Sequence, residues 1–190
     1  LGDQEILDES KKRFDKFLKN SNSLSADLQE TVFVLVAWQG NESTYKKFLS
    51  LYKKGKSQEE KLRFLAAMCN FQQKKLLLKT LEFTLGPDVR SQNIQMPIMR
   101  IAANIHGKDF LWSWLKKNWK KIVKKAGIGN PLLNRVVASI GQVVDAKQEK
   151  EIRQFFKANP LRGTEMTFEQ TMERVRVSSK FQNSIKKEFS

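Results

Sequence analysis

The turn at residues 126–130, Ala-Gly-Ile-Gly-Asn, is the stretch of this sequence best suited to hold a ligand. Glycine lets a backbone approach a ligand closely, and a helix is expected directly after the turn, with Pro131 at its first position. The first N–H groups of a helix have no partner within it, so they can bind a carboxylate or a phosphate. Arg90 and Arg135 could supply guanidinium groups for the same anion. Most glycine-rich turns before helices are only turns, so both interpretations stay open.

The motifs that would make the chain an enzyme by itself are missing. The single histidine, His106, excludes H-E-x-x-H, and the single cysteine, Cys69, excludes a cysteine-based zinc site and an intrachain disulfide. The phosphate-binding loop, the dinucleotide-binding glycine motif and G-x-S-x-G do not occur. We expect His106, just past a helix, to cap or pack rather than to act as a base, and Cys69, on an apolar face, to be buried and unreactive. The sequence therefore predicts no catalytic residue and no metal site.

The composition describes a folded and strongly basic protein. Hydrophobic residues make up 40% of the chain, and the formal net charge is +15. A charge of this size permits nucleic-acid, anionic-membrane or acidic-protein partners without selecting among them. Lysines flank a tryptophan-rich helix, either as a solvated face or as a membrane or nucleic-acid surface. They are Lys116, Lys117, Lys120, Lys121, Lys124 and Lys125.

Location is predicted from the N-terminus and from apolar run lengths. No apolar run reaches the roughly 18 residues that a membrane span needs. The first residues are polar and acidic, unlike a signal peptide. We therefore expect a cytoplasmic protein with no membrane partner.

Nearly the whole chain has the apolar spacing of amphipathic helices. The segment 31–36, Thr-Val-Phe-Val-Leu-Val, is β-branched enough for a buried strand, but we predict helix because strand partners are missing elsewhere. Ten helices are expected, and their ends follow capping residues, glycines and prolines. The first five are expected at 3–20, at 25–38 with Ser25 as cap, at 42–54, behind the capping box Ser57–Glu60 with Leu62 and Cys69 on the apolar face, and at 72–85. The next three are expected between Pro97 and Asn104, across 110–123, and from Pro131 with Val144 as the last apolar residue. The last two are expected at 145–158 and from about 167 to the end.

The helices group into pairs that begin near residues 5, 42, 72, 108 and 146. This spacing of about 30 to 38 residues is the period of a two-helix solenoid repeat. We predict an all-α, superhelical array of about five antiparallel helix pairs, an α-solenoid of the HEAT or armadillo kind. Because no residue-level repeat motif accompanies the period, a compact all-α domain is the alternative.

Residues 89–127, VRSQNIQMPIMRIAANIHGKDFLWSWLKKNWKKIVKKAG, resemble the C-terminal helical domain of the zinc aminopeptidases. This family includes puromycin-sensitive aminopeptidase and the archaeal tricorn-interacting factors. Three other stretches resemble the same domain: LGDQEILDESKKRFDKFL, SQEEKLRFLAAMCNFQQKKLLLKTLEFTL and EIRQFFKANPLRGTEMTFEQTMERVR. Departures from the family pattern are Ile105 in place of proline, Asn93 in place of aspartate, and Met166 with Thr167 in place of arginine and an aliphatic residue.

The resemblance implies that residues 1–190 form a single helical repeat domain, the C-terminal fragment of a larger aminopeptidase. It implies a domain that encloses the substrate chamber and helps to bind and size-select peptides for N-terminal trimming. Zinc and the catalytic groups would belong to an upstream catalytic domain of the same polypeptide, so this chain should be inactive alone. Its expected partners are that domain and peptide substrates, not nucleic acid. The predicted peptide-binding residues are Arg90, Gln92, Gly127, Gly129, Asn130 and Arg135.

The alternative function is that of a free-standing basic scaffold for nucleic acid or an acidic protein, which the charge of +15 allows. A continuous basic groove would favour the scaffold, and scattered lysines would favour the aminopeptidase domain.

Overall fold

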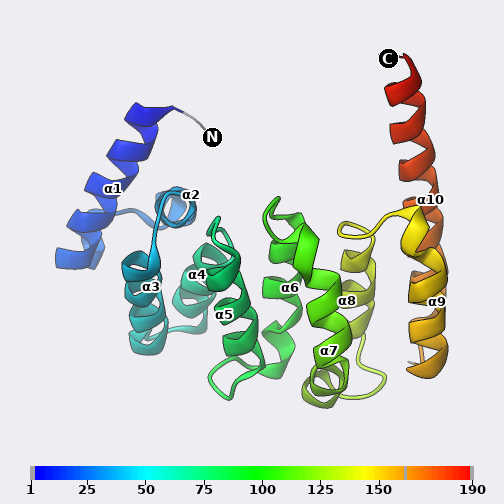
Figure 1. Ribbon diagram of the computed structural model, residues 1–190. Helices are drawn as coiled ribbons and strands as arrows, with labels where there is room; N and C mark the ends of the chain where they lie inside the picture. Colours follow the sequence, from blue (N-terminus) through cyan, green and yellow to red (C-terminus); the bar gives the residue numbers. More distant parts are fainter. Residues whose placement is uncertain (1–2, 161, 189–190) are drawn as a thin grey trace. The chain divides into compact units, whose positions relative to one another are not determined.

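The computed structural model describes residues 3–160 and 162–188. Over these ranges it consists of ten α-helices and three short 3₁₀ helices, without a β-strand (Figure 1). The all-α prediction is therefore confirmed. The helix predicted for residues 31–36 is also confirmed, because these residues lie within α2 (Ala26–Trp38). Val32, Phe33 and Val36 are buried there, so packing of α2 against its neighbours overrides the strand preference of its β-branched residues.

Two compact units make up the chain, and they divide between Asp88 and Val89. Whether residues 1–190 form a single domain stays a prediction. The helices of the first unit are α1 (Gln4–Lys19), η1 (Ser21–Ser23), α2, α3 (Glu42–Lys54), α4 (Gln58–Met68) and α5 (Lys74–Leu85). Those of the second are η2 (Ser91–Asn93), α6 (Gln95–Ala103), α7 (Lys108–Ala126), α8 (Leu132–Ile140), η3 (Ala146–Gln148), α9 (Glu149–Ala158) and α10 (Glu165–Glu188).

Helix packing follows two patterns within the units. Consecutive helices pack together in the predicted pairs α1 with α2, α3 with α4, and α7 with α8. Alternate helices also pack side by side, α2 with α4 in the first unit and α6 with α8 and α8 with α10 in the second. Contacts of both kinds are typical of helical repeats, in which each helix touches the next one and the one after it.

Phenylalanine rings fill the core of the first unit. Phe33 on α2 lies 5.8 Å from Phe14 on α1, 5.9 Å from Phe48 on α3 and 5.3 Å from Phe64 on α4, measured between ring centroids. All four rings are buried. Four helices therefore meet around one side chain, and offset or edge-to-face pairs of this kind each add about 0.5–1.5 kcal/mol to the burial of apolar area.

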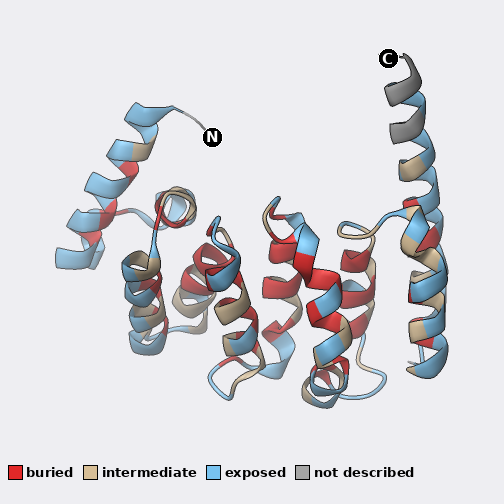
Figure 2. Cartoon of the chain, viewed as in Figure 1, coloured by how far each residue is buried: buried red, intermediate tan, exposed pale blue. Residues whose placement is uncertain are grey.

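Aliphatic side chains from α6, α7 and α8 fill the core of the second unit, where Figure 2 shows buried residues on the facing sides of these helices. Met172 and Val175 of α10 close it from the side of α8. The turn between α6 and α7 is tight at Gly107, where an added Cβ would lie 2.0 Å from the carbonyl oxygen of Ile101. Only glycine fits this position, which brings the two helices close together.

Capping side chains start several of the helices. Asp3 accepts hydrogen bonds from the N–H groups of Glu5 and Ile6, which starts α1. Ser57 and Glu60 form the predicted capping box of α4, with the Glu60 N–H 3.1 Å from the Ser57 Oγ. Asp145 likewise opens the next helix through a capping box, with η3 as its first turn.

Some predicted details are wrong. Ser25 occupies the N-cap position of α2, but its side chain makes no capping hydrogen bond. The helix that begins after Pro131 ends at Ile140, because turns follow at 141–143, and Val144 lies beyond it. Leu62 is only half-buried, whereas Phe64 and Met68 of the same helix are buried. The last helix begins at Glu165 rather than at Thr167, and the predicted continuation to residues 189–190 lies outside the described residues.

Candidate functional site

The predicted glycine turn is exposed and has the backbone that glycine allows. Gly127 and Gly129 have φ of 91° and 77°, in the left-handed region, and Gly127 ends α7. An added Cβ would meet no atom within 4 Å at either glycine. These glycines are therefore required by backbone conformation, not by lack of space.

The N-terminus of α8 is not the open anion site that the sequence suggested. The Asn130 Oδ1 accepts a hydrogen bond of 3.0 Å from the Leu132 N–H, and the Asn130 Nδ2 donates one of 2.8 Å to the Ala126 carbonyl. The next two N–H groups, of Leu133 and Asn134, donate to the carbonyls of Asn130 and Pro131. The first turn of α8 is thus satisfied by the chain itself, and its amides are not free to bind a ligand.

The other predicted peptide-binding residues lie on the surface of the second unit. Arg90 occupies the N-cap position of η2 and Gln92 lies within η2, while Arg135 lies on α8, and all three residues are exposed. Among the described residues, neither arginine takes part in an ion pair, and no hydrogen bond joins the three side chains. Their role in peptide binding stays a prediction.

An apolar groove lies beside the glycine turn instead. It has a volume of about 340 Å³ between α7, the turn and the end of α9. Its lining residues are Trp119, Lys120, Val123, Lys124, Ile128, Asn159 and Pro160. We call it the α7–α9 groove.

The walls of the α7–α9 groove combine apolar side chains with two cations. Ile128, between the two glycines, is 82% exposed, which is unusual for a large aliphatic side chain. Lys120 and Lys124 are four residues apart on α7 and exposed, and neither pairs with a carboxylate among the described residues. No acidic residue lines the groove. The arrangement suits an apolar group that carries a negative charge.

The Trp119 ring forms the floor of this groove, and two phenylalanine rings pack against it. Trp119 is only 3% exposed, and its ring meets Phe155 and Phe156 edge to face at centroid distances of 5.8 and 5.2 Å. Both phenylalanines come from α9, so the floor is held by packing between two helices. A rigid floor of this kind loses little conformational entropy when a ligand binds.

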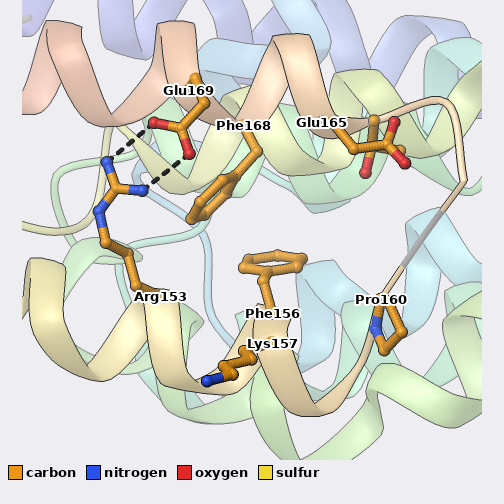
Figure 3. Close-up of a pocket in the computed structure, with 8 residues that line it drawn as sticks. Arg153, Phe156, Lys157, Pro160, Glu165, Phe168 and Glu169 are labelled. Atoms are coloured by element: carbon orange, nitrogen blue, oxygen red, sulfur yellow. Dashed lines mark hydrogen bonds and ion pairs between the residues drawn. The ribbon is translucent and has the colours of Figure 1, made fainter.

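A second crevice lies between α9 and α10, with a volume of about 320 Å³, and Figure 3 shows its lining. The rings of Phe156 and Phe168 face each other across it at 4.9 Å. The Arg153 guanidinium donates two hydrogen bonds, of 2.8 and 2.9 Å, to the Glu169 carboxylate and lies 5.5 Å from the Phe168 ring. A third bond, of 2.8 Å, joins Arg153 Nε to Glu149.

The ion pairs of Arg153 engage the main charged groups between α9 and α10. The two bonds from Arg153 hold the pKa of Glu169 below its ordinary value, and the two carboxylates raise the pKa of Arg153. The Glu165 carboxylate accepts a 2.8 Å hydrogen bond from the Gly163 N–H. The ion pair between Arg153 and Glu169 and the contact between the Phe156 and Phe168 rings hold α9 against α10 across the crevice.

Glu151 links α7 to α9 in a similar way. Its carboxylate accepts hydrogen bonds from the Lys116 ammonium and, at 3.3 Å, from the Trp112 Nε1. The bond from Lys116 is the main cause that lowers the pKa of Glu151. One lysine of the basic face is therefore structural, whereas Lys120 and Lys124 are left exposed at the groove.

Cys69 has the structural role that the sequence predicted for it. It is fully buried, and its thiol donates to the Leu65 carbonyl at 3.2 Å, so no reactive thiolate is exposed there.

His106 also belongs to a structural turn. Its backbone N–H donates to the Asn104 Oδ1 at 2.9 Å in the turn between α6 and α7. No group of three or more histidine, cysteine, aspartate or glutamate side chains that could hold a metal occurs in the described part of the chain. Within the same residues, no helix is long and apolar enough to cross a membrane.

The α7–α9 groove was only partly predictable. The sequence analysis identified the turn and the lysine-rich helix separately, and it paired the turn with Arg90 and Arg135 rather than with Lys120 and Lys124. The spacing of Lys120 and Lys124, just before the glycines on one helix, was a signal that could have linked them. Asn159 and Pro160 come from a distant part of the sequence, and only the packing of α9 on α7 places them at the groove.

Comparison with known proteins gives one family. Residues 1–177 match the family described as "ERAP1-like C-terminal domain". The chain is 30% identical over 194 residues to Aminopeptidase M1-C of Oryza sativa subsp. japonica, which covers 99% of this chain and 22% of that protein. It is 28% identical over 158 residues to Alanine/arginine aminopeptidase of Saccharomyces cerevisiae, covering 83% of this chain and 18% of that protein.

A mammalian aminopeptidase is also similar to this chain. Glutamyl aminopeptidase of Mus musculus is 28% identical over 165 residues, which are 86% of this chain and 18% of that protein. The chain thus spans only about a fifth of the length of the relatives it matches, and the matched part is their C-terminal region. Because the family match covers residues 1–177 and the fold is all-helical, the chain belongs to the ERAP1-like C-terminal domain family, the C-terminal domain of M1 aminopeptidases.

Proposed function

We propose that this chain is the non-catalytic part of an aminopeptidase and that it helps to enclose a chamber in which peptides are trimmed. The observation that supports this most directly is the family match over residues 1–177. A wall around an active site excludes bulk water and folded proteins, and so restricts substrates to peptides that fit inside. Selection of peptides by size follows from the same enclosure.

The reaction itself belongs elsewhere in this proposal. The chain offers no metal-binding group in its described residues, and its sequence has no H-E-x-x-H. Zinc and the residues that activate water would therefore be supplied by a catalytic domain of the same polypeptide. The contribution of this chain is to bind and position the peptide.

The α7–α9 groove is our candidate for the peptide contact. Two ammonium groups, of Lys120 and Lys124, lie at its rim without a neighbouring acid, and Val123, Ile128 and Trp119 provide apolar surface. A peptide that ends in an apolar residue presents both features at once, an apolar side chain and a terminal carboxylate. The sequence-predicted residues Arg90 and Arg135 belong to the same unit and are a second set of cations to be tested.

The test is a titration of short peptides with free or amidated C-termini against this chain, followed by fluorescence anisotropy. We expect the free carboxylate to bind about three- to tenfold more tightly, because one or two exposed ion pairs contribute about 0.2–1 kcal/mol each. The variant Lys120→Gln/Lys124→Gln should remove that preference. Arg90→Gln/Arg135→Gln tests the sequence-predicted pair in the same assay.

A matched control is available on the same helix. Lys117 and Lys121 are also exposed and also four residues apart on α7, but they do not line the groove. Lys117→Gln/Lys121→Gln changes the net charge equally and should leave the preference intact. Equal affinity for free and amidated peptides, or loss of the preference in both lysine variants, would count against a carboxylate-binding groove. Nucleic-acid binding that weakens steeply with salt would favour the basic scaffold instead.

A further inference from the structure

Most of the positive charge of this protein lies in its second unit. Residues 89–190 hold more than half of the lysines and arginines but fewer than half of the aspartates and glutamates, in a chain of net charge +15. Some of these cations are engaged in ion pairs, as Lys116 is with Glu151. The cations that remain unpaired therefore determine where this unit attracts an anion.

Three unpaired lysines follow one side of α9. Lys147 lies in η3, directly before α9, and Lys150 and Lys157 lie on α9 itself. All three are exposed, and none has an ion-pair partner among the described residues. Together with Gln154 they follow the spacing i, i+3, i+7, i+10, which places them on the same side of the helix. We call the three lysines the α9 lysine row.

The opposite side of α9 holds the row in place. Ile152 and Phe156 are buried there, and the Phe156 ring packs edge to face on Trp119 of α7 at a centroid distance of 5.2 Å. The start of the row is held by the Ala146 N–H, which donates to the Ser179 Oγ of α10 at 3.2 Å. Since packing fixes the backbone beneath the lysines, only their side chains have to be ordered when an anion binds.

The α9 lysine row borders a hollow of about 520 Å³ on the surface of the second unit, which we call the η3–α9 hollow. Glu149 is the one acid among the described residues that line this hollow, and it is paired with Arg153 at 2.8 Å. An anion in the hollow therefore meets three ammonium groups, whereas the nearby carboxylate is already neutralised.

The η3–α9 hollow adjoins the α7–α9 groove by way of the crevice between α9 and α10. Arg153 and Lys157 line both the hollow and the crevice, and Pro160 lines both the crevice and the groove. Figure 3 shows these three residues along α9 and just past its end. The three depressions therefore follow one another along α9.

The length of the row matches a short stretch of extended peptide. Lys147 and Lys157 are about ten residues apart, which corresponds to about 15 Å along a helix. An extended peptide covers that length with about four or five residues. A peptide with its C-terminal residue in the α7–α9 groove would therefore pass the α9 lysine row with the residues that precede it.

We propose that the α9 lysine row binds acidic side chains of peptide substrates. This inference rests on the peptide-binding role proposed above, and it adds a substrate class, namely peptides with aspartate or glutamate several residues before an apolar C-terminus. Complementary charge supports it, because three unpaired ammonium groups lie in one row. Among the described residues that line the η3–α9 hollow none is aromatic, so the hollow lacks the stacking surface that single-stranded nucleic acids use. A peptide is therefore favoured over a nucleic acid.

The test compares two labelled peptides of equal length by fluorescence anisotropy against the full 190-residue chain. One carries several glutamates before an apolar C-terminal residue, and the other carries glutamines at the same positions. Each peptide is made with a free and with an amidated C-terminus. The variant Lys150→Gln/Lys157→Gln removes two cations of the row. Lys117→Gln/Lys121→Gln is the matched control, because it changes the net charge equally at exposed lysines of α7 that line none of the three depressions.

We expect the glutamate peptide to bind about three- to tenfold more tightly than the glutamine peptide, as a few exposed ion pairs allow. Lys150→Gln/Lys157→Gln should remove most of this difference, and Lys117→Gln/Lys121→Gln should retain it. A difference that survives in Lys150→Gln/Lys157→Gln, or that disappears equally in both variants, would overturn the proposal. So would a single-stranded oligonucleotide that binds more tightly than the glutamate peptide and is lost in Lys150→Gln/Lys157→Gln.

The two C-termini separate this inference from the proposed function. Equal affinity for the glutamate and glutamine peptides, with a preference for the free carboxylate, would overturn the role of the lysine row and leave the α7–α9 groove as the peptide contact. A glutamate preference that depends on the row, with equal affinity for free and amidated C-termini, would support the row and count against the groove. Absence of both preferences would refute both proposals.

Discussion

Each unit of this protein contains a cluster of packed aromatic rings, but the surroundings of those rings differ. In the first unit the Phe33 ring is enclosed by phenylalanines from three other helices, and no charged group takes part in those ring contacts. In the second unit the aromatic cluster of α7 and α9 is bordered by charges. Glu151 binds the Trp112 Nε1, and Arg153 lies over Phe168 while it binds Glu169.

This difference indicates how each unit is stabilised. Apolar packing does not depend on pH, whereas a carboxylate held by a cation contributes only while it is ionised. The stability of the first unit should therefore change mainly when a substitution alters the volume of a core side chain. The stability of the second unit should also depend on pH, on salt concentration and on how closely the backbones of its helices approach each other. The following experiments would break or sharpen this contrast, from the largest expected effect to the smallest.

Phe33→Ala should cause the largest loss of stability. Removing a fully buried ring that touches three helices should cost about 3–5 kcal/mol in free energy of unfolding, measured by urea denaturation with circular dichroism. Phe33→Leu should recover most of the loss because it refills the volume. A cost below about 1 kcal/mol for Phe33→Ala would show that this ring is not the centre of the first core.

Gly107→Ala should be the most damaging single-methyl change in the second unit. The new Cβ would lie 2.0 Å from the Ile101 carbonyl oxygen, so α6 and α7 must move apart, at a cost of about 1–3 kcal/mol. Gly129→Asn is the control, because the site is open and asparagine tolerates positive φ. Tryptophan fluorescence is a suitable signal, since Trp112, Trp114 and Trp119 all belong to this unit. Equal stability of the two variants would contradict the close approach of the helices.

Glu169→Gln should lower stability by about 0.2–1 kcal/mol at neutral pH, the range of exposed ion pairs. The pKa of Glu169 is lowered in the folded protein, so its contribution is complete above the unfolded pKa of about 4.3 and disappears as the pH falls through the lower, folded value. The difference between wild type and Glu169→Gln should therefore shrink as the pH is lowered from about 5 to 3. Urea melts followed by tryptophan fluorescence at a series of pH values measure this. A difference that stays constant with pH would exclude an electrostatic origin.

Lys120→Gln/Lys124→Gln should have the smallest effect on stability, within about 0.5 kcal/mol, because both lysines are exposed and neither pairs with an acid among the described residues. The melting temperatures of this variant and of Lys116→Gln are compared by thermal unfolding. Since Lys116 binds Glu151, Lys116→Gln should be the more destabilised of the two. Greater destabilisation by the groove variant than by Lys116→Gln would reverse this assignment. A neutral result would mean that any change in peptide binding reflects the groove and not the fold.

Several features of the protein were fixed by residue type and local spacing. The capping residues Asp3, Ser57 and Asp145 start helices where the sequence predicts, and Gly55 ends α3 where expected. These signals are reliable because an N-cap bond or a glycine at a helix end involves only residues within about one turn of each other. The buried, unreactive state of Cys69 was predictable from its apolar helix face for the same reason.

Tertiary structure alone decided which surfaces face one another. The segment 31–36 has strand-forming residues, but as a helix its phenylalanine reaches the rings of three other helices. The sequence paired the glycine turn with Arg90 and Arg135, whereas the groove beside the turn is lined by Lys120 and Lys124 of α7. Asn159 and Pro160 reach the same groove only because α9 packs on α7. The amides of α8 were expected to be free, but the Leu132 N–H donates to the Asn130 side chain and the next two N–H groups donate to backbone carbonyls. Such outcomes depend on contacts between residues far apart in the chain or on the rotamer of one side chain, and neither leaves a periodic signal in the sequence.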